Sequence, residues 1–600
     1  MERRTFVKLV LGSTAAALVG VELTGPGFSS ALGLPDGLFQ YGVASGDPLP
    51  NGIVIWTRVT PSPDATPGSG AGAPTVVEWS VCTDSALLNV VQSGSVVTSP
   101  TSDHTVKIDV TGLSPASSYY YGFRIGTVQS VVGRCKTAPA ATADNTQVRF
   151  GFVSCSNYAA GYFVPYRCLA ERNDLDFVLH VGDYIYEYGD GGYGSLRPLD
   201  PPTEIVSLSD YRRRFAVYRS DADLAALHAR HPFITTLDDH ETTNDAWSDG
   251  AQNHQSPAEG DYITRRNDAY QAYFEWMPIR PSVTSPTETR FYRSLRFGKL
   301  VDLTMMDLRQ YRSQQPTTYA AAQSSARTMT GADQFAWLQA QLTKSDAAAW
   351  QLFGNSVQIM QVRYPVQFGL SDGAGTFRNV DAWDGYQAQR TQLLQFVADN
   401  DSTWDAVFLT GDIHSTWAAD LRPNFDAVAT PSVGTEFVCT SVTSDNLNEI
   451  VGLPPRNAQS IAIENGIKAL NPHIKLLEFD SHGYSVVDVN ATRVQTDWYY
   501  VSDRQNPAAT CSIGFSKQTL FGEKKIAAVD PTTPIVDNTV PPVEVPEVPL
   551  GVLLPVSAAL VLGGAMALRN RGAEQAAAAR SESTRLNSSH LDLSRMPSSA

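Results

Sequence analysis

The chain has 600 residues, of which 42% are hydrophobic and 18% are charged. This length exceeds what one compact domain normally contains, and the composition predicts a well-buried core. The formal net charge of −16 argues against nucleic acid as a stable partner, because phosphate backbones are bound by clustered Lys and Arg, but it does not exclude a small phosphate ester held by metal ions.

The first 31 residues have the features of an export signal. Arg3 and Arg4 precede a weakly apolar stretch that ends at Gly20, and Ser29-Ser30-Ala31 supplies the small residues of a cleavage site. We expect residues 1–31 to be a signal peptide for the twin-arginine export machinery, which carries folded, metal-loaded proteins. An ordinary Sec signal or an amphipathic start is the alternative.

Residues 38–140 have the pattern of a small all-β domain. Short segments separated by turns alternate between apolar and polar residues, and no long helical period appears, which predicts a fibronectin III or immunoglobulin-like sandwich. Leu113-Ser114-Pro115 followed by Tyr119 resembles the tyrosine corner of fibronectin type III-like domains. We expect no catalysis in this domain.

Residues 146–503 alternate apolar strands with helical stretches, which predicts a layered α/β domain with a mixed sheet. The expected strands are 148–153, 177–181, 233–237, 300–306, 350–353 and 406–410, with further strands near 436–444 and 474–501. The expected helices are 210–230, 331–342 and 384–398. No internal repeat is visible.

The C-terminal part has the features of a membrane anchor. Residues 504–549 are expected to be an extension that ends in a stiff proline-rich linker. The 19 residues 550–568 carry no charge and precede Arg569 and Arg571, which predicts a transmembrane helix whose C-terminal end lies in the cytoplasm; a buried core helix is the alternative. Residues 569–600 are expected to be a cytoplasmic tail that is partly artefactual. The chain would thus be an exported, surface-anchored monomer.

Six cysteines in an exported chain favour disulfides, although the sequence alone does not give the connectivity. Cys82 and Cys135 share the N-terminal module and are the favoured pair. Cys155 sits at a strand end among other potential ligands, and we interpret it as a thiolate ligand rather than as a small buried apolar residue.

Side chains that bind metals follow several of the expected strands. In an α/β fold, ligands lie on the loops that leave the carboxyl ends of buried strands. The groups in chain order are Ser154-Cys155, Asp183 with Tyr186, Asp238-Asp239-His240-Glu241 with Asn244, Asp307 to Arg312, and Asp412 with His414. A metallohydrolase site is the simplest interpretation.

A two-metal phosphoesterase needs a carboxylate that bridges the metals, and Asp183 is the natural bridge. Thiolate, phenolate and imidazole on one metal favour a ferric ion or another transition metal. Carboxylate and amide oxygens favour a hard ion such as calcium at the second position.

Seven strings in this order resemble the PhoD-type alkaline phosphatases, which belong to the calcineurin-like metallophosphatases. They are SC, GDYIYEY, DDHE, MDLRQYR, FGNSVQ, GDIHSTWAADL and FDSHGYSVVDV, and the run FQYGVASGDP resembles the start of that family's N-terminal domain. The resemblance covers about residues 38–505. It implies a four-layer αββα metallophosphatase domain preceded by the small all-β domain.

The resemblance also implies the cofactors Fe3+ and Ca2+. By position, the iron ligands would be Cys155, Asp183, Tyr186 and His414, and the calcium ligands would be Asp183, Asn244 and Asp412, with Asp239 as a further candidate. The Asp-x-His pair that opens the wider superfamily is replaced here by Ser154-Cys155. This replacement supports the PhoD branch and argues against a site with only zinc or only manganese.

The expected reaction is the hydrolysis of small phosphomonoesters at alkaline pH, with release of inorganic phosphate after attack by a metal-bound hydroxide. His240 is the candidate that binds phosphate or protonates the leaving alcohol, although it could only hydrogen-bond its neighbours. Arg309 is the candidate that neutralises charge in the transition state, although it could instead form a structural ion pair with Asp307.

Three other functions remain open at this stage. A phosphodiesterase, including a phospholipase D-like activity, needs the same metal core. A binding or adhesion protein with a degenerate enzyme domain is disfavoured by the intact ligand set. A serine-nucleophile phosphatase has Ser154 and Ser415 as candidates, but neither lies in a nucleophile-elbow motif.

Overall fold

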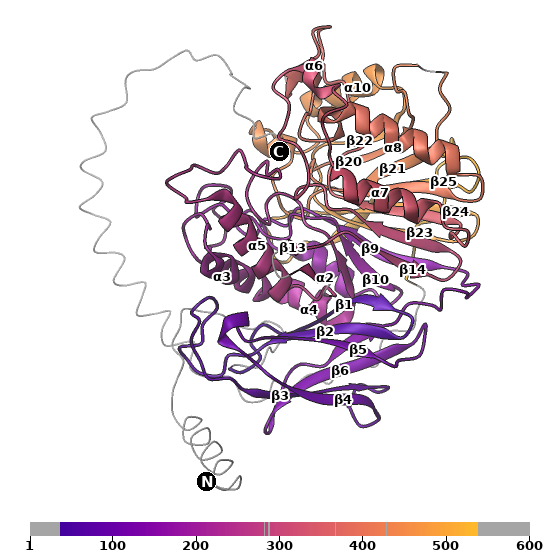
Figure 1. The fold of residues 1–600 in the computed structure, drawn as a ribbon. Coiled ribbons are helices and arrows are strands. Elements are labelled where there is room, and N and C mark those ends of the chain that lie inside the picture. The colour runs from indigo at the N-terminus through magenta and orange to yellow at the C-terminus, as the bar shows by residue number, and fades with distance from the viewer. Residues whose placement is uncertain (1–36, 281–282, 286–287, 366–367, 428, 538–600) are drawn as a thin grey trace, which may run out of the picture.

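The structure is a computed structural model that describes residues 37–280, 283–285, 288–365, 368–427 and 429–537 (Figure 1). The expected signal peptide at 1–31, the membrane anchor at 550–568 and the tail at 569–600 lie outside the described residues. Within the described ranges, no helix combines the length and the apolar character that crossing a bilayer requires.

A mixed sheet of nine strands forms one half of the molecule, in the order β25-β24-β23-β9-β10-β11-β1-β2-β5. Its central strands β9, β10 and β11 are parallel, and β23 joins β9 in the antiparallel direction. The bounds are β1 Val43–Leu49, β2 Gly52–Arg58, β5 Thr105–Thr111, β9 Val148–Val153, β10 Phe177–His180, β11 Phe233–Thr235, β23 Gly483–Val489, β24 Arg493–Val501 and β25 Cys511–Leu520.

A second sheet of seven strands has the order β14-β15-β16-β19-β21-β20-β22. Four neighbouring strands, β15, β16, β19 and β21, are parallel. The bounds are β14 Arg293–Phe297, β15 Val301–Met305, β16 Trp350–Asn355, β19 Asp405–Thr410, β20 Thr416–Leu421, β21 Gly434–Val438 and β22 Ile474–Glu478. Two short hairpins, β12 Val283–Ser285 with β13 Glu288–Thr289 and β17 Leu370–Ser371 with β18 Phe377–Arg378, stand apart.

The two large sheets share one hydrophobic core. Phe152 and Leu179 of the nine-stranded sheet pack in the same buried cluster as Leu303 and Val407 of the seven-stranded sheet. Because the strands that contribute to this core are buried and apolar, their sequences are continuous hydrophobic runs rather than alternating ones.

Helices cover the outer faces of both sheets (Figure 1). The nine-stranded sheet packs against α2 Val164–Ala170, α3 Leu208–Arg219, α4 Ala222–Arg230 and α5 Tyr262–Trp276, and the seven-stranded sheet packs against α7 Gly331–Leu342, α8 Gln387–Asn400 and α10 Ala458–Leu470. The remaining short helices are η1 Pro100–Ser102, α6 Tyr319–Ala322, η2 Trp383–Gly385 and α9 Leu447–Ile450.

The helix expected at 210–230 is divided into α3 and α4. Asp221 has extended backbone, and its carboxylate accepts from the backbone N–H groups of Asp223 and Leu224. This side chain caps α4 and so ends the preceding helical run. Helix α5 was not expected, because Arg265 and Glu275 are buried on it and obscure its apolar stripe.

The N-terminal region is all-β, as expected, but it is not a separate sandwich. One of its sheets contains β3 Val76–Cys82, β4 Val90–Val97, β6 Ser118–Ile125, β7 Val128–Gln129 and β8 Gly133–Lys136. The facing strands β1, β2 and β5 belong to the nine-stranded sheet, since β1 pairs in parallel with β11 through Gly46 and Phe233. A Cβ at Gly46 would lie 2.1 Å from the carbonyl oxygen of Pro278, so glycine allows this close approach.

The tyrosine corner expected in this region is confirmed. The Tyr119 hydroxyl accepts a hydrogen bond of 2.9 Å from the backbone N–H of Ser114, and Tyr119 is buried among Val77, Phe123 and Leu113. The contact fixes the turn that precedes β6.

The favoured disulfide between Cys82 and Cys135 was wrong. Both thiols are free and buried, and the bond in the structure joins Cys168 of α2 to Cys511 of β25. Cys82 pairs with Tyr120, and Cys135 pairs with Tyr119, on opposite edges of β6. Two strands that flank a third lie about 10 Å apart, which exceeds the reach of a disulfide of about 7 Å between Cα atoms.

The α/β fold also extends beyond residue 503, where its end was expected. Strand β25 is the last strand of the nine-stranded sheet, and Ile526 and Ile535 are buried in the two cores beside that sheet. The described part of the expected extension, residues 504–537, is therefore part of the folded body, and the proline-rich linker lies outside the described residues.

Candidate metal centre

The loops that follow five parallel strands bring the expected ligands together. Cys155 follows β9, Asp183 and Tyr186 follow β10, Asp238 to Asn244 follow β11, Arg309 follows β15, and Asp412 and His414 follow β19. Strands from both sheets thus contribute to one site. Cys155, Asp183, Tyr186, Asp239, Asp412 and His414 are each at most 2% exposed.

Four of these residues have an unusual backbone. Cys155, Asp183, Asp412 and His414 have φ angles of 58°, 56°, 68° and 47°. Non-glycine residues rarely adopt this left-handed conformation, and where they do the residue is often functional. The turns at the strand ends therefore aim these side chains at one point.

Gly182 permits the sharp turn before Asp183. Its φ is +112°, and a Cβ at this position would lie 2.5 Å from the Cβ of Asp238. The glycine therefore allows the loops after β10 and β11 to touch. Glu241 joins the same two loops, because its carboxylate accepts from the backbone N–H groups of Asp183 at 3.2 Å and Asp238 at 2.7 Å.

The first group of ligands contains sulfur, nitrogen and oxygen donors. One ligand atom from each of Cys155, Asp183 and His414 lies within 4.8 Å of the other two. The Tyr186 hydroxyl donates to Oδ2 of Asp183 at 3.0 Å and lies 3.3 Å from Nε2 of His414. His414 donates from Nδ1 to the carbonyl of Asp445 at 2.9 Å, which leaves Nε2 as the nitrogen that faces the group.

The second group consists of carboxylates. Asp238, Asp239 and Asp412 offer oxygens that lie within 4.8 Å of one another, and Asp183 and Asp239 form a similar group with His240. Asp183 thus belongs to both the sulfur-containing group and a carboxylate group, as a bridging ligand would. Within the described residues, one buried oxygen of each of Asp183, Asp238, Asp239 and Asp412 has no hydrogen-bond partner.

These orphaned oxygens fit bound cations. Burial raises the pKa of Asp183 and Asp412 well above the usual range, and neighbouring carboxylates including Asp238 raise it further. Burial likewise raises the pKa of the Cys155 thiol and of the Tyr186 phenol. So many acidic groups ionise together in a buried site only when positive charge compensates them, and metal ions provide that charge.

His240 is bound to a carboxylate on its far side. Its Nδ1 donates to Oε2 of Glu187 at 2.7 Å, and its ring lies 4.2 Å from the ring of Tyr186, measured between centroids. Burial alone would lower the pKa of His240, but Glu187, Asp239 and Asp183 together raise it well above its usual value. Burial alone would raise the pKa of Glu187, but His240 lowers it to about 2. The Glu187 carboxylate therefore favours the protonated form of the imidazole.

Asn244 lies beside this pair. Its backbone N–H donates to Oε1 of Glu187 at 2.8 Å, and its side-chain amide donates to Gln252 at 3.0 Å. These contacts connect Asn244 to His240 through Glu187. A role for Asn244 as a calcium ligand stays a prediction.

Arg309 lies inside the carboxylate cluster and is 1% exposed. Its guanidinium contacts Asp238, lies 2.8 Å from Asp381 and reaches Asp412 at 3.4 Å and Asp239 at 3.5 Å. The guanidinium of Arg309 does not form the ion pair with Asp307 that the sequence left open, because Asp307 accepts from the backbone N–H of Arg309 at 3.1 Å and from Gln310 instead. The geometry favours balancing of carboxylate charge over a direct contact with substrate.

Sequence reasoning missed several residues of this site. Asp238 was recognised in its string but was not assigned as a ligand, although it belongs to the carboxylate group. Asp381 and Asp245 form a further group with Asp239. Asp381 does not directly follow a strand of the sheet, so the strand-end pattern gave no signal for it.

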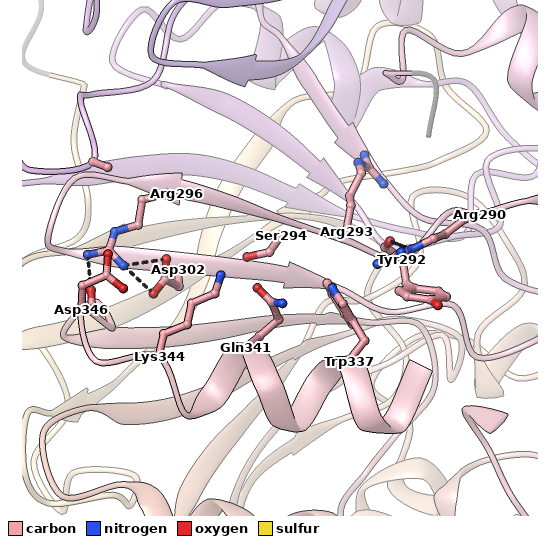
Figure 2. Close-up of a pocket in the computed structure, with 11 residues that line it drawn as sticks. Arg290, Tyr292, Arg293, Ser294, Arg296, Asp302, Trp337, Gln341, Lys344 and Asp346 are labelled. Atoms are coloured by element: carbon pink, nitrogen blue, oxygen red, sulfur yellow. Dashed lines mark hydrogen bonds and ion pairs between the residues drawn. The ribbon is translucent and has the colours of Figure 1, made fainter. Parts of the chain in front are cut away.

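A cavity of about 430 Å³ lies elsewhere, between the edge strand β14 and helix α7 (Figure 2). Arg290, Tyr292, Trp337, Gln341 and Lys344 are among its lining residues. Two further arginines in its wall are already paired, since Arg293 binds Asp47 and Arg296 binds Asp302. None of its lining residues belongs to the candidate metal groups, so the cavity is separate from the metal centre.

Comparison with known proteins gives consistent matches. The family model described as PhoD-like phosphatase matches residues 150–498, and the model of the PhoD-like phosphatase N-terminal domain matches residues 31–139. Alkaline phosphatase D of Bacillus subtilis (strain 168) is 36% identical over 534 residues, which cover 85% of this chain and 86% of that protein. A solved structure of PhoD is 33% identical, covers 85% of this chain and 94% of its own, and superposes with a TM-score of 0.73.

Proposed function

The chain belongs to the PhoD-like phosphatase family and is an alkaline phosphatase of the PhoD type, a metal-dependent phosphoesterase, and from this premise we propose how its site is built. Cys155, Asp183, Tyr186 and His414 hold a ferric ion. The observation that carries this proposal is the convergence of these four buried side chains, three of them from left-handed turns at strand ends. Their mixed sulfur, nitrogen and phenol donors suit a transition metal.

Calcium is proposed for the carboxylate side of the site. Asp183 would contribute to both positions, and Asp412 and Asn244 would hold the calcium, with Asp239 as a further candidate. The buried oxygens of Asp183, Asp239 and Asp412 that lack a donor support this assignment, because hard cations prefer oxygen ligands. Asp238 joins the same cluster and is added to the candidates.

The bound metal ions would supply Lewis acidity for the phosphate oxygens and lower the pKa of water. Within the chain, His240 holds a proton and protonates the leaving alcohol. Glu187 keeps that proton on the imidazole from the opposite side, at 2.7 Å. Arg309 offsets the repulsion among Asp238, Asp381 and Asp412 and so keeps the carboxylates close enough to share cations.

We further propose that the domain has the four-layer αββα order and that the chain is exported by the twin-arginine route, anchored at the cell surface and monomeric. Three separate buried clusters, one between the large sheets and one under each set of helices, support the layer order. The adjacent Arg3 and Arg4 support the export route, and the uncharged residues 550–568 support the anchor.

The test is a side-by-side assay of a phosphomonoester and a phosphodiester with the same leaving group, using the iron- and calcium-loaded chain. We expect monoester turnover to exceed diester turnover. Asp183→Asn removes the bridging charge and should lower monoester turnover by about 10³-fold, equivalent to about 4 kcal/mol. Asp530→Asn, which changes a carboxylate paired with Lys517 at the surface, is the control and should leave turnover unchanged.

Each opposite result has a distinct meaning. Faster diester hydrolysis would make the chain a phosphodiesterase, including the phospholipase D-like alternative. Bound metal with no turnover of either ester would favour a binding protein with a degenerate site. Full activity of Asp183→Asn would contradict the proposed bridge.

A further inference from the structure

The loop after β21, residues 439–446, contacts the strand end that carries Cys155. The backbone N–H of Val442 donates to the carbonyl of Ser154 at 3.1 Å, and the N–H groups of Thr443 and Ser444 both donate to the carbonyl of Cys155 at 3.3 Å. Because Cys155 has a left-handed backbone, these bonds hold a conformation that the chain would otherwise avoid.

Ser444 also reaches a second ligand. Its Oγ lies 2.7 Å from the hydroxyl oxygen of Tyr186 and 3.0 Å from the carbonyl of Cys155. When Tyr186 is a neutral phenol, its own hydrogen is donated to Asp183. When Tyr186 binds a metal as a phenolate, its oxygen becomes an acceptor only, and the hydroxyl of Ser444 is the adjacent donor.

The same loop fixes a third ligand. The carbonyl of Asp445 accepts from Nδ1 of His414 at 2.9 Å and so determines which nitrogen faces the site. The backbone N–H of Asp445 in turn donates to the hydroxyl of Tyr193 at 3.0 Å. One loop therefore makes hydrogen bonds to Cys155, Tyr186 and His414.

We propose that residues 439–446 position the ligands on the iron side and that Ser444 is a positioning residue that donates a hydrogen bond to the phenolate oxygen of Tyr186. This inference rests on the proposed iron site. A hydrogen bond to a phenolate weakens the donation of electrons from its oxygen to the metal. Ser444 would therefore make the ion at this position a stronger Lewis acid.

Arg504 holds the loop in place from one side. One terminal nitrogen of its guanidinium donates to the carbonyl of Thr443 at 2.5 Å, and the other lies 2.5 Å from Oδ1 of Asp445. Arg504 is 7% exposed, so this pair of contacts is largely shielded from solvent.

A chain of three side chains holds the loop from the other side. Oγ of Ser441 lies 2.8 Å from Nδ1 of His482, and Nε2 of His482 lies 3.1 Å from Oε1 of Glu449. These contacts resemble a nucleophile–base–acid arrangement. Ser441 is fully buried, however, and its Oγ also contacts the carbonyl of Ser444 at 2.8 Å and Asn446 at 2.7 Å, so the three residues anchor the loop.

The test compares Ser444→Thr with Ser444→Val in the iron-loaded protein. The two side chains have nearly the same shape, but only threonine keeps a hydroxyl donor. The first readout is the visible absorption band from phenolate-to-iron charge transfer, and the second is the pH profile of kcat. We expect Ser444→Thr to match the wild type. We expect Ser444→Val to bind iron but to show its charge-transfer band at longer wavelength. The acidic limb of its kcat–pH profile should move to higher pH, and its turnover should be about tenfold lower.

Ser485→Ala is the matched control, because it removes another fully buried serine hydroxyl, one that makes no hydrogen bond within the described residues. It should not move the band. Coincident bands in Ser444→Thr and Ser444→Val would overturn the inference, and Ser444→Ala gives the same comparison if the β-branched residues disturb folding. A wild-type protein that binds no iron and shows no band would instead overturn the iron site itself, and this inference with it.

Discussion

Single side chains at the strand ends decide the chemistry of this site, and their roles follow from what each one touches. His240 combines a carboxylate partner on Nδ1 with a position next to Asp183 and Asp239. Bound cations would neutralise those two aspartates, but Glu187 would remain to hold the proton on the ring. In the role proposed for His240, a protonated imidazole would donate its proton to the leaving alcohol.

Replacement of His240 by alanine should therefore lower turnover by about 10²- to 10³-fold without loss of metal. The loss should be largest for an alkyl phosphate and much smaller for nitrophenyl phosphate, because nitrophenolate leaves without a proton. Metal analysis and kcat for both esters check this prediction. Equal losses on the two esters would assign His240 to phosphate binding, and unchanged turnover would reject both roles.

Asp412 shows the opposing demands of folding and metal binding. Its left-handed backbone and its buried carboxylate are both unfavourable without a cation, and burial raises its pKa in the folded state. Because this pKa is raised, the contribution of Asp412 to the stability of the metal-free fold is greatest below the unfolded carboxyl pKa of about 4 and is lost as the pH rises.

Asp412→Asn should thus stabilise the metal-free protein at pH 8 by about 1–2 kcal/mol and weaken metal binding at least tenfold. Denaturant unfolding of the metal-free wild type and variant at pH 5 and pH 8 measures the first effect, which should be larger at pH 8. With metal bound, the wild type should be more stable than Asp412→Asn. A variant that is less stable than the wild type without metal at pH 8 would contradict the argument.

The strand-end pattern predicted most of the candidate ligands because Cys155, Asp183 and Asp412 directly follow parallel strands. The same pattern missed Asp381, which reaches the site through Arg309 and Arg312 rather than from a strand end. The favoured bond between Cys82 and Cys135 failed for a related reason. The two cysteines lie in the same N-terminal region of the sequence, but the sequence does not show that strand β6 lies between them.

At the level of elements, the sequence predicted buried strands well and helices less well. β15 and α7 agree with their expected positions within a residue, since each has a clear apolar pattern and clear ends. The division between α3 and α4 depends on one capping aspartate within a continuous helical pattern. Helix α5 buries charged residues through tertiary ion pairs, such as Arg212 with Glu275, which no local pattern reveals.

The short helix α9 carries Glu449, which helps to hold the loop of residues 439–446 and affects the stability of the protein at low pH. Burial alone would raise the pKa of Glu449, but hydrogen bonding to His482 and the charge of Arg504 lower it to about 2. A depressed carboxyl pKa gives stability that is present above the unfolded pKa of about 4.3 and is lost as the pH falls towards 2.

Glu449→Gln should lower the free energy of unfolding at pH 7 by about 1–3 kcal/mol. The difference from the wild type should shrink as the pH falls below about 4.3. Thermal unfolding at pH 7, 5 and 4 checks the trend. Lys517→Gln, at a surface ion pair with Asp530, is the control and should change stability little at any pH. A difference that is constant over this pH range would show that the charge of Glu449 is not responsible.

At the scale of the whole molecule, the N-terminal region and the α/β domain share one sheet and one buried core. Trp56 of β2 donates to the carbonyl of Glu275 on α5 at 2.8 Å, and the guanidinium of Arg219 lies 4.4 Å from the centroid of the Trp56 ring. The strands of the expected sandwich were predicted correctly, but the sandwich is not a separate domain. The pairing of β1 with β11 at Gly46 joins it to the larger sheet, and no local sequence pattern reveals that pairing.

Deletion of residues 1–140 should therefore yield an insoluble or unfolded chain, because it exposes the edge of β11 and the apolar surface around Trp276. Deletion of residues 538–600 removes none of the described structure and is the matched control. Soluble yield, circular dichroism and iron content measure the outcome. A soluble 141–537 fragment with bound iron would show that the two regions fold separately.

The shared sheet also determines when the protein can become complete during its synthesis. Strand β1 begins at Val43 and β25 ends at Leu520, yet both belong to the same nine-stranded sheet. At about 5–20 residues per second, a ribosome delivers the last strand roughly 20–100 s after the first. For that interval the sheet lacks its last edge strand, so it cannot be complete before β25 has been synthesised. Export of the folded chain would therefore have to follow the synthesis of β25, whereas export of an unfolded chain would leave all nine strands of this sheet to pair outside the cell.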